Sequence, residues 1–464
     1  MGDNLNNFHT VQLKDEILKE LKNDLKRIKV DDNYIDENNA QDKLEQLISW
    51  MSSTPKNIVI RVNTILCEPS TVHHKINEFL KQYSRPLPNI KTFPHVEELI
   101  VINSWEGNRG SKLTTVANEL IVDAACGVAV LRGAHIFAPG VLGMPRGLKI
   151  GDKVSVYADL KKNCKKGLVI NYDINSKLFI GNGIVNLTRD QIFANYEKSP
   201  SGIAVFMSDT ISHVPQLNEE ILPKGQILLQ NLPSVICSRV LNPQPRDIIL
   251  DMCAAPGNKT THISALMKNE GTVIALEKNK NKFDKLLSNI NLFDAKNVKA
   301  FCFDSTQAVC ESKDKPVFDG PPFSEESFDR ILLDGPCSAL GQRPQICNPL
   351  KLSQLRSYVP LQRKLFSAAA RLLKIGGNLM YSTCTITIAE NEGIVSWALK
   401  TFPNLELKSI KKNLFDLKID GIASVGYSVD GLSIEQSNNL CRFETKNEYV
   451  GFFIACFTKK YDCL

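Results

Sequence analysis

Two cysteines, Cys337 and Cys384, follow short apolar runs and have small or polar neighbours. Cys337 lies in the segment DGPCS (334–338), and Cys384 lies in YSTCT (381–385). A single cysteine at such a place is more often core filler than a reactive group. Two of them beside a methyl donor would fit one reaction, in which a thiolate adds to a poorly nucleophilic ring and activates it. The spacing alone leaves open which cysteine attacks.

Acidic residues end three successive apolar runs, after a loop of small residues at 253–259 with the sequence CAAPGNK. Small residues let backbone N–H groups approach a ligand at a helix N-terminus. The loop lacks Gly-x-Gly-x-x-Gly and the Gly-Lys-[Ser/Thr] ending, which disfavours a nicotinamide dehydrogenase and a nucleotide hydrolase. Each acid alone is more often a helix cap. Together the acids Glu277, Asp304 and Asp334 predict S-adenosylmethionine rather than a dinucleotide, with Glu277 on the ribose and Asp304 on the adenine amino group. The predicted cofactor-binding residues are Cys253, Ala254, Ala255, Pro256, Gly257, Asn258, Lys259, Glu277, Asp304 and Asp334.

With such a donor, the cysteine pair predicts methylation of cytosine at carbon 5. A thiolate that adds to carbon 6 turns the ring into an enamine, whose carbon 5 can attack a methyl group. Asp334 is placed to stabilise the intermediate near ring N3, and Lys259 could lower a thiol pKa or hold the nucleotide. A base, which the sequence does not identify, must then remove the carbon-5 proton. The target base must leave any stack to be reached.

The elements that must position these residues alternate between strand and helix from about residue 247. This alternation predicts an α/β, Rossmann-like core with a doubly wound, mostly parallel sheet. In such sheets ligands bind beyond the carboxyl ends of the strands, near the point where the strand order reverses. The predicted strands are 248–252, 272–277, 298–304, 330–334, 378–382 and 450–457. The predicted helices are 260–267, 278–293, 361–373 and 392–402.

The rest of the chain divides into two regions with different patterns. Residues 1–110 are predicted to be mostly helical, with a short strand at 58–62. Residues 111–203 contain short β-type runs, among them 128–131, 154–157 and 178–180, separated by Gly, Pro and Asn. Residues 204–464 then form the catalytic domain. The chain is therefore predicted to be a methyltransferase with a small β module inserted after its N-terminal region.

The formal net charge of +6 is concentrated in that module. Residues 111–201 hold 12 basic and 7 acidic side chains, whereas the remaining residues hold 44 and 43. The cluster KKNCKK at 161–166 could bind phosphates, and Arg132, His135 and Phe137 could meet bases. A solvated hairpin of lysines would explain the cluster equally well. The candidate RNA-binding residues are Arg132, Phe137, Lys165 and Lys166.

Other classes of function find little support in the composition. The 13 cysteines include no Cys-x-x-Cys pair, and none of the seven histidines lies near a cysteine pair, so we expect reduced thiols and no metal. No run of 18 apolar residues occurs, and the first ten residues do not resemble a secretory signal, so we expect no membrane partner. The default expectations are a cytoplasmic location and a monomer; the sequence does not determine the oligomeric state.

Several motifs resemble those of the Nol/Nop/Sun RNA cytosine-5 methyltransferases. They are the segments 252–260, 333–341 and 381–385 with AENE at 389–392, together with RVNT at 61–64. The resemblance implies that Cys384 attacks, that Cys337 assists product release, and that S-adenosylmethionine is the cofactor. The segments LRGAHIFAPG (131–140) and GDKVSVY (151–157) resemble a PUA RNA-binding domain, which characterises a tRNA-methylating branch of the family. This implies 5-methylcytosine formation near the 3′ CCA end of tRNA.

The chain departs from the family pattern at a few positions. Asn258 stands where Gly is common, Glu277 where Asp is frequent, and Gly335 and Ala339 where the family has Ala-Pro-Cys-Ser-Gly. These departures leave donor affinity and activity open. The alternative is therefore an RNA-binding protein with a degenerate, inactive methyltransferase fold. A methyltransferase for small molecules or proteins would leave the basic module and the cysteine pair unexplained.

Overall fold

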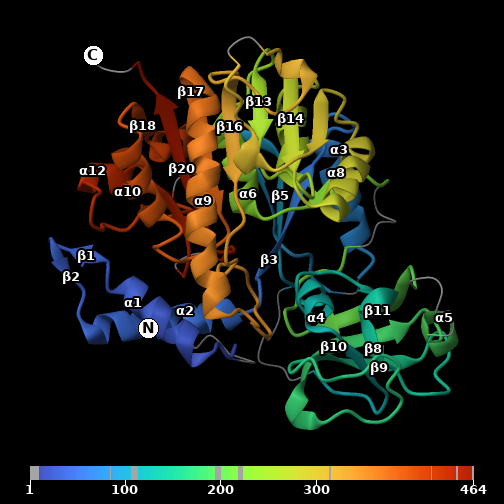
Figure 1. The fold of residues 1–464 in the computed structure, drawn as a ribbon. Coiled ribbons are helices and arrows are strands. Elements are labelled where there is room, and N and C mark those ends of the chain that lie inside the picture. The colour runs from blue at the N-terminus through green and yellow to red at the C-terminus, as the bar shows by residue number, and fades with distance from the viewer. Residues whose placement is uncertain are drawn as a thin grey trace.

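The computed structural model describes residues 10–83, 85–105, 113–193, 200–217, 223–312, 315–419, 421–445 and 448–461. An eight-stranded sheet with flanking helices forms the largest body, and a separate β module and the first two helices of the chain lie below it in Figure 1. No helix among the described residues is long and apolar enough to cross a membrane. No cluster of three or more His, Cys, Asp or Glu side chains in the same residues could hold a metal ion.

The large sheet has the strand order β15-β14-β13-β16-β17-β20-β18, and β19 pairs with β20. Strands β13, β14, β15, β16 and β17 are all parallel to one another, whereas β20 runs antiparallel to β17 and β18. The predicted doubly wound, mostly parallel sheet is therefore confirmed. The strand order reverses between β13 and β16. The strands are β13 (Ile248–Asp251), β14 (Thr272–Glu277), β15 (Val298–Cys302), β16 (Phe328–Asp334), β17 (Leu373–Thr383), β18 (Leu405–Lys408), β19 (Cys441–Phe443) and β20 (Phe452–Lys459).

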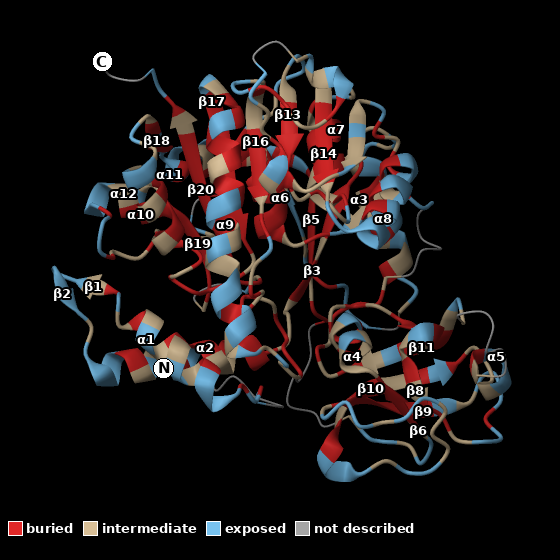
Figure 2. Cartoon of the chain, in the orientation of Figure 1, coloured by how far each residue is buried: buried red, intermediate tan, exposed pale blue. Residues whose placement is uncertain are grey.

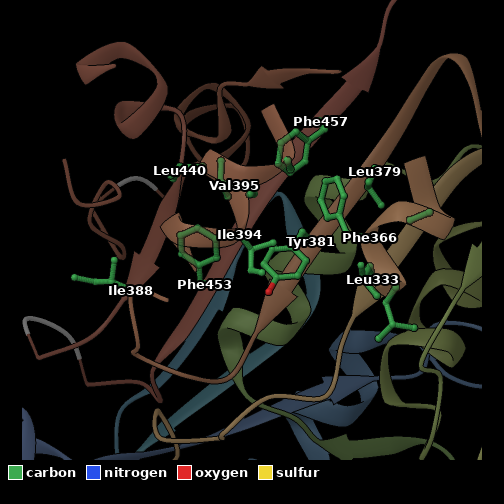
Figure 3. Close-up of a cluster of buried hydrophobic side chains, with 14 of the residues drawn as sticks. Leu333, Phe366, Leu379, Tyr381, Ile388, Ile394, Val395, Leu440, Phe453 and Phe457 are labelled. Atoms are coloured by element: carbon green, nitrogen blue, oxygen red, sulfur yellow. The ribbon is translucent and has the colours of Figure 1, made fainter. Parts of the chain in front are cut away.

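Helices cover both faces of this sheet, so its central strands are buried on both sides, as Figure 2 shows in red. Successive residues of β17 point to opposite faces. Leu379 and Tyr381 pack in one core with Phe366 and Ile394, and Met380 packs in the other. Figure 3 shows the first of these cores. The helices that pack in this core include α9 (Leu352–Leu372) and α10 (Glu392–Thr401). The opposite face of the sheet carries α6 (Leu232–Leu241), α7 (Asn258–Leu266) and α11 (Ile410–Asp416). Helix α8 (Lys280–Leu292) packs on β14 and β15. The short α12 (Ile434–Asn438) precedes β19.

The N-terminal region is less helical than predicted. It contains the helices α1 (Asp15–Leu25), α2 (Glu37–Ser52) and α3 (Pro69–Leu80), but also a second sheet of order β12-β3-β5-β4. The sequence analysis missed β5 because its apolar residues do not alternate with polar ones. Leu99 and Val101 pack with α6, while Ile100 and Ile102 pack with α3. The strands are β3 (Asn57–Val62), β4 (Ile90–Phe93), β5 (Val96–Asn103) and β12 (Ile227–Leu229), with a small hairpin of β1 (Lys29–Val30) and β2 (Asn33–Tyr34).

The inserted module is a six-stranded sheet of order β7-β11-β10-β9-β6-β8. Its last strand, β11, runs from Ile203 to Thr210, so the module extends past the boundary predicted at residue 203. The predicted strand at 128–131 is wrong: it forms the end of helix α4, which Asp123 caps by accepting a hydrogen bond from the Cys126 N–H. The elements are β6 (Glu119–Val122), α4 (Ala124–Leu131), β7 (Ile136–Phe137), β8 (Val141–Gly143), β9 (Lys153–Asp159), β10 (Lys177–Val185), α5 (Arg189–Phe193) and β11.

Candidate active site

A cavity of about 560 Å³ lies at the carboxyl ends of β13, β16 and β17, where the strand order reverses. Its volume falls within the range of small-molecule sites. Residues from the catalytic sheet, from α4 of the inserted module and from β3 line it together. Those that the argument uses are Asp251, Cys253, Asn258, Lys259, Asp334, Cys337, Gln342, Cys384 and Arg132.

The small-residue loop after β13 leads directly into α7. Gly257 has a φ of +105°, a conformation that L side chains rarely adopt, and a Cβ there would lie 3.0 Å from Leu286 Cδ1. Asn258 is the first residue of the helix, and its φ is not positive. The loop therefore needs glycine at 257 and tolerates Asn258, since an Asn side chain is compatible with a helical first turn. Cys253, Ala254, Ala255, Pro256 and Asn258 all line the cavity.

Four carboxylates lie close enough to the Cys253 thiol to raise its pKa. Burial raises the pKa of Cys253 well above its usual range, and Asp251, Asp334, Glu277 and Asp304 raise it further. The predicted acids at the strand ends therefore come together around the small-residue loop. Glu277 accepts a hydrogen bond from the Asn279 N–H. The described cavity lining includes neither Glu277 nor Asp304, which lie beside it at the ends of β14 and β15.

The carboxylate of Asp304 is already engaged with nearby donors. Its Oδ1 atom accepts hydrogen bonds from the backbone N–H and the hydroxyl of Thr306. Its Oδ2 atom lies 2.7 Å from the Nζ atom of the exposed Lys278. An adenine amino group that bound here would share this carboxylate with the lysine.

Asp251 is a site residue that the sequence analysis did not select. It is buried, its Oδ2 atom accepts a hydrogen bond from the Thr260 hydroxyl, and its Oδ1 atom has no protein partner. Burial raises the pKa of Asp251 to about 7. Its position as the last residue of β13, directly before the loop, was the signal that could have identified it.

Lys259 and Asp334 form a short ion pair inside the cavity. The Lys259 Nζ atom lies 2.5 Å from Asp334 Oδ2, and the Ser382 hydroxyl donates to Asp334 Oδ1 at 2.7 Å. Ser382 is the residue of β17 that pairs with Asp334 of β16, so the strand register sets this contact. Burial lowers the pKa of Lys259, but the ion pair with Asp334 and the nearby thiols of Cys237 and Cys384 together raise it above its usual value. Lys259 is therefore a fixed cation.

The two candidate catalytic cysteines meet at the ends of neighbouring parallel strands. Their Sγ atoms are 3.3 Å apart. A hydrogen bond from the Cys337 thiol lowers the pKa of Cys384, and the Gln342 side chain and Lys259 act in the same direction against burial. The contact with Cys384, burial and the Glu390 carboxylate raise the pKa of Cys337. These surroundings favour the thiolate form at Cys384 over Cys337.

A hydrogen-bond network ties the two cysteine loops together. The hydroxyls of Ser338 and Thr385, which follow the two cysteines, are 2.6 Å apart. The buried Glu390 carboxylate accepts hydrogen bonds from the Ser338 N–H at 3.0 Å and from Gln362 Nε2 at 2.9 Å. The Tyr381 ring packs in the core of Figure 3, and its hydroxyl donates to the Glu390 carbonyl at 2.6 Å. The AENE motif therefore contributes a structural carboxylate that holds the thiols in place.

The candidate RNA-binding residues lie in different surroundings. Phe137, Lys165 and Lys166 are exposed on the module. Arg132 instead faces the catalytic body, where its guanidinium donates to Arg343 O and Gln342 Oε1. The prediction that His135 meets a base is wrong, because the ring is buried and its Nδ1 atom accepts a hydrogen bond from the Met207 N–H.

Comparison with known proteins identifies the family. The family described as 16S rRNA methyltransferase RsmB/F matches residues 238–458. Human tRNA (cytosine(72)-C(5))-methyltransferase NSUN6 is 41% identical over 446 residues, which cover 90% of this chain and 92% of that protein. The chain belongs to the RsmB/F methyltransferase family. A Pyrococcus horikoshii tRNA (cytosine(72)-C(5))-methyltransferase is 30% identical over 372 residues, which cover 80% of this chain and 85% of that protein.

A solved structure of this family extends the likeness to the whole fold. The crystal structure of NSun6 from Pyrococcus horikoshii with SFG has a TM-score of 0.70 and 26% identity. It covers 97% of this chain and 99% of that chain. The inserted module and the N-terminal region therefore belong to the shared architecture.

Two departures from the RsmB/F family pattern now have a physical description. Ala339 has a φ of +56°, in the left-handed region that favours the glycine common in the family. At Gly335, a Cβ atom would lie 3.7 Å from Leu333 Cδ1, which is ordinary van der Waals contact. The alanine common in the family would fit there. Neither departure removes a polar group from the cavity.

Proposed function

We propose that this chain is an S-adenosylmethionine-dependent tRNA methyltransferase that forms 5-methylcytosine near the 3′ CCA end. One observation carries the proposal: two thiols 3.3 Å apart share a cavity with the Lys259–Asp334 pair and the small-residue loop. The NSUN6 relatives supply the position, cytosine 72 of tRNA. An inactive RNA-binding protein would have no need for this arrangement of reactive groups.

The residues around the loop fit the cofactor. Asp251 lines the cavity and has a buried carboxylate oxygen with no protein partner, which can accept from a ligand ammonium group. The segment Cys253–Lys259 exposes backbone N–H groups at the start of α7, which suit the ligand carboxylate. Glu277 holds the ribose hydroxyls and Asp304 the adenine amino group. When bound, S-adenosylmethionine supplies an electrophilic methyl group.

The protein side chains prepare the cytosine for methylation. The Cys384 thiolate adds to carbon 6, which makes carbon 5 nucleophilic. Addition places negative charge on the ring, and a proton that Asp334 takes up before addition passes to ring N3 and neutralises this charge, while Lys259 fixes the carboxyl group. The proton returns to Asp334 when the bond to Cys384 breaks. After methylation a base removes the carbon-5 proton, and the bond between Cys384 and carbon 6 breaks. Cys337 assists this release.

In this proposal the inserted module binds the tRNA. We assign it as a PUA-type domain in which Lys165 and Lys166 hold phosphates and the exposed Phe137 stacks on a base. Its sheet adjoins the catalytic cavity through α4, so RNA held there can present its end to the thiols. A tRNA substrate suits a cytoplasmic location, which we propose, and a monomer is the default proposal for the oligomeric state.

The test of activity uses S-adenosylmethionine labelled in its methyl group and a pool of unmodified tRNA transcripts. We expect label in RNA as 5-methylcytosine, mapped to position 72. Label at another cytosine would contradict the proposed site. Binding of the donor with no label in any RNA would contradict catalysis.

The roles of the two cysteines separate in single variants. Cys384→Ala should abolish methyl transfer, because no thiolate is left to activate the ring. Cys337→Ala should slow release, so that a covalent protein–RNA adduct accumulates and shifts the protein on a denaturing gel. The reverse pattern, an adduct in Cys384→Ala, would overturn the assignment. The double variant should show neither turnover nor adduct.

A further inference from the structure

One side chain of the inserted module reaches into the catalytic body. Arg132 follows α4, and its Nε and Nη2 atoms donate to the Arg343 carbonyl at 3.0 and 2.7 Å. Nη2 also donates to Gln342 Oε1 at 3.1 Å. These hydrogen bonds direct the Arg132 guanidinium toward the catalytic body rather than toward an exposed RNA-binding face. The module is therefore joined by hydrogen bonds to the segment that follows Cys337.

The acceptor of this contact, Gln342, lies beside the nucleophile. Gly341 donates its N–H to the Cys384 carbonyl at 3.0 Å, and a Cβ at Gly341 would lie 2.8 Å from that oxygen. The missing side chain thus lets the two segments approach closely. Gln342, Cys384 and Arg132 line the same cavity. Because the Gln342 oxygen accepts from Arg132, its amide nitrogen is the end that remains to donate.

A donor at this point matters because Cys384 is partly buried at the base of the cavity. A thiolate removed from water needs compensation by hydrogen bonds or positive charge. The groups that face it are Asp334 at the end of β16, Cys337 in the loop after that strand, Lys259 of α7, and Arg132, which follows α4 and donates to Gln342. The Gln342 side chain lowers the pKa of Cys384, in addition to the larger effect of the Cys337 hydrogen bond.

We propose that Gln342 is a positioning residue that relays the docking of the inserted module to the nucleophile. Arg132 holds the amide oxygen, and the amide N–H stabilises the Cys384 thiolate. The inference rests on the proposed role of Cys384 and deepens it. The Cys384 thiolate is fully stabilised only while the inserted module is docked. The reactivity of Cys384 therefore depends on the position of this module.

The test measures the alkylation of Cys384 by iodoacetamide as a function of pH. Peptide mass spectrometry reads this cysteine separately from Cys337 and the other thiols. Two variants change the amide: Gln342→Met removes donor and acceptor, and Gln342→Glu keeps an acceptor for Arg132 but removes the donor. Both should raise the apparent pKa of Cys384. A rise of about one unit lowers the alkylation rate about tenfold at pH values below the pKa.

The relay requires that Arg132 act through Gln342. Arg132→Met should shift the Cys384 profile in the same direction as Gln342→Met, and the double variant should match Gln342→Met alone. Gln354→Met is the matched control, since this exposed glutamine caps α9 and should leave the profile unchanged. Superimposable profiles for wild type and both Gln342 variants would overturn the proposal. So would independent, multiplying effects of Arg132→Met and Gln342→Met.

The design separates this inference from the proposed substrate. Alkylation is measured without RNA and without donor, so the relay can stand even if tRNA is not methylated. A thermal unfolding midpoint within the range of wild type shows that each variant is folded. If Gln342→Met fails this check, Gln342→Glu and Arg132→Met still carry the comparison. In the methylation assay, the limb of the pH profile that reports the thiolate should move by the same amount.

Discussion

At the residue scale, Cys337 and Cys384 have the same side chain but different surroundings. Cys384 receives hydrogen bonds and faces Lys259, whereas Cys337 lies near the Glu390 carboxylate. These neighbours lower the pKa of one thiol and raise that of the other. The difference in pKa, which suits the proposed nucleophile and helper roles, therefore arises from the groups that the fold brings beside the two thiols. Spacing in the sequence could not reveal it.

The backbone of the loop that carries Cys337 also allows a prediction about stability. Ala339 has a φ of +56°, so Ala339→Gly should raise the free energy of unfolding by about 1 kcal/mol, because relief of the left-handed strain exceeds the added chain entropy. Urea unfolding of the two proteins measures the difference. Gly335→Ala is the companion change; it should also stabilise, since its methyl group meets only ordinary contacts. A loss of stability in Ala339→Gly would contradict the strain argument.

At the element scale, the N-terminal sheet supports α7, the helix that follows the small-residue loop. Glu98 of β5 pairs with Arg239 of α6 and, at 2.9 Å, with His262 of α7. Arg61 of β3 donates to the Thr261 hydroxyl of α7 at 2.9 Å. These four elements are far apart in the sequence. The RVNT motif thus acts by positioning α7 rather than by touching the cavity.

The burial of His262 predicts a pH dependence of the stability of the fold. Burial lowers the pKa of His262 to about 4, against about 6.5 in an unfolded chain. As the pH falls from 6.5 toward 4, the unfolded chain takes up a proton that the native state excludes, so the fold loses stability. The loss from this group between pH 7 and pH 5 is about 2 kcal/mol.

His262→Gln removes this titrating group while it keeps a donor for Glu98. The decrease in the free energy of unfolding between pH 7 and pH 5 should be smaller in the variant than in wild type by that amount. Urea unfolding at the two pH values measures it. Equal decreases in the two proteins would show that His262 is not the responsible group.

At the scale of the whole molecule, the active site is assembled from separate parts of the chain. The cavity is lined by β3, by α4 of the module, and by the loops after β13, β16 and β17. The module carries most of the net charge, while the catalytic body is nearly neutral. This division places the attraction for a polyanion beside the cavity rather than inside it.

The charged module predicts a salt-dependent affinity for tRNA. The double variant Lys165→Ala/Lys166→Ala should weaken binding and reduce the slope of log affinity against log salt by about 2, since each phosphate contact contributes about one unit. Binding titrations at several salt concentrations measure the slope. The control is Lys411→Ala/Lys412→Ala, which removes two exposed lysines of α11 outside the module. An unchanged slope in the first variant would contradict the phosphate contacts.

The sequence predicted the catalytic half of the fold better than the N-terminal half. Alternating strands and helices are local patterns, so β13 to β17 and helices α7 to α10 matched their expected places within a few residues, apart from the longer starts of β17 and α9. The N-terminal sheet was missed because β12 joins β3 only after the module intervenes. The strand expected at 128–131 was a helix because Asp123 supplies an N-terminal cap. Such contacts are not visible in hydrophobic periodicity.

The sequence by itself determined the chemistry: two cysteines, a lysine, the acids at strand ends and a loop of small residues. These are covalent facts about side chains and their order along strands. Only the tertiary structure decided which groups face one another: the 3.3 Å approach of the thiols, the unpartnered oxygen of Asp251, and the turn of Arg132 toward Gln342. The physical reason is that pKa values and hydrogen bonds depend on distance and burial, which folding sets between residues remote in the chain.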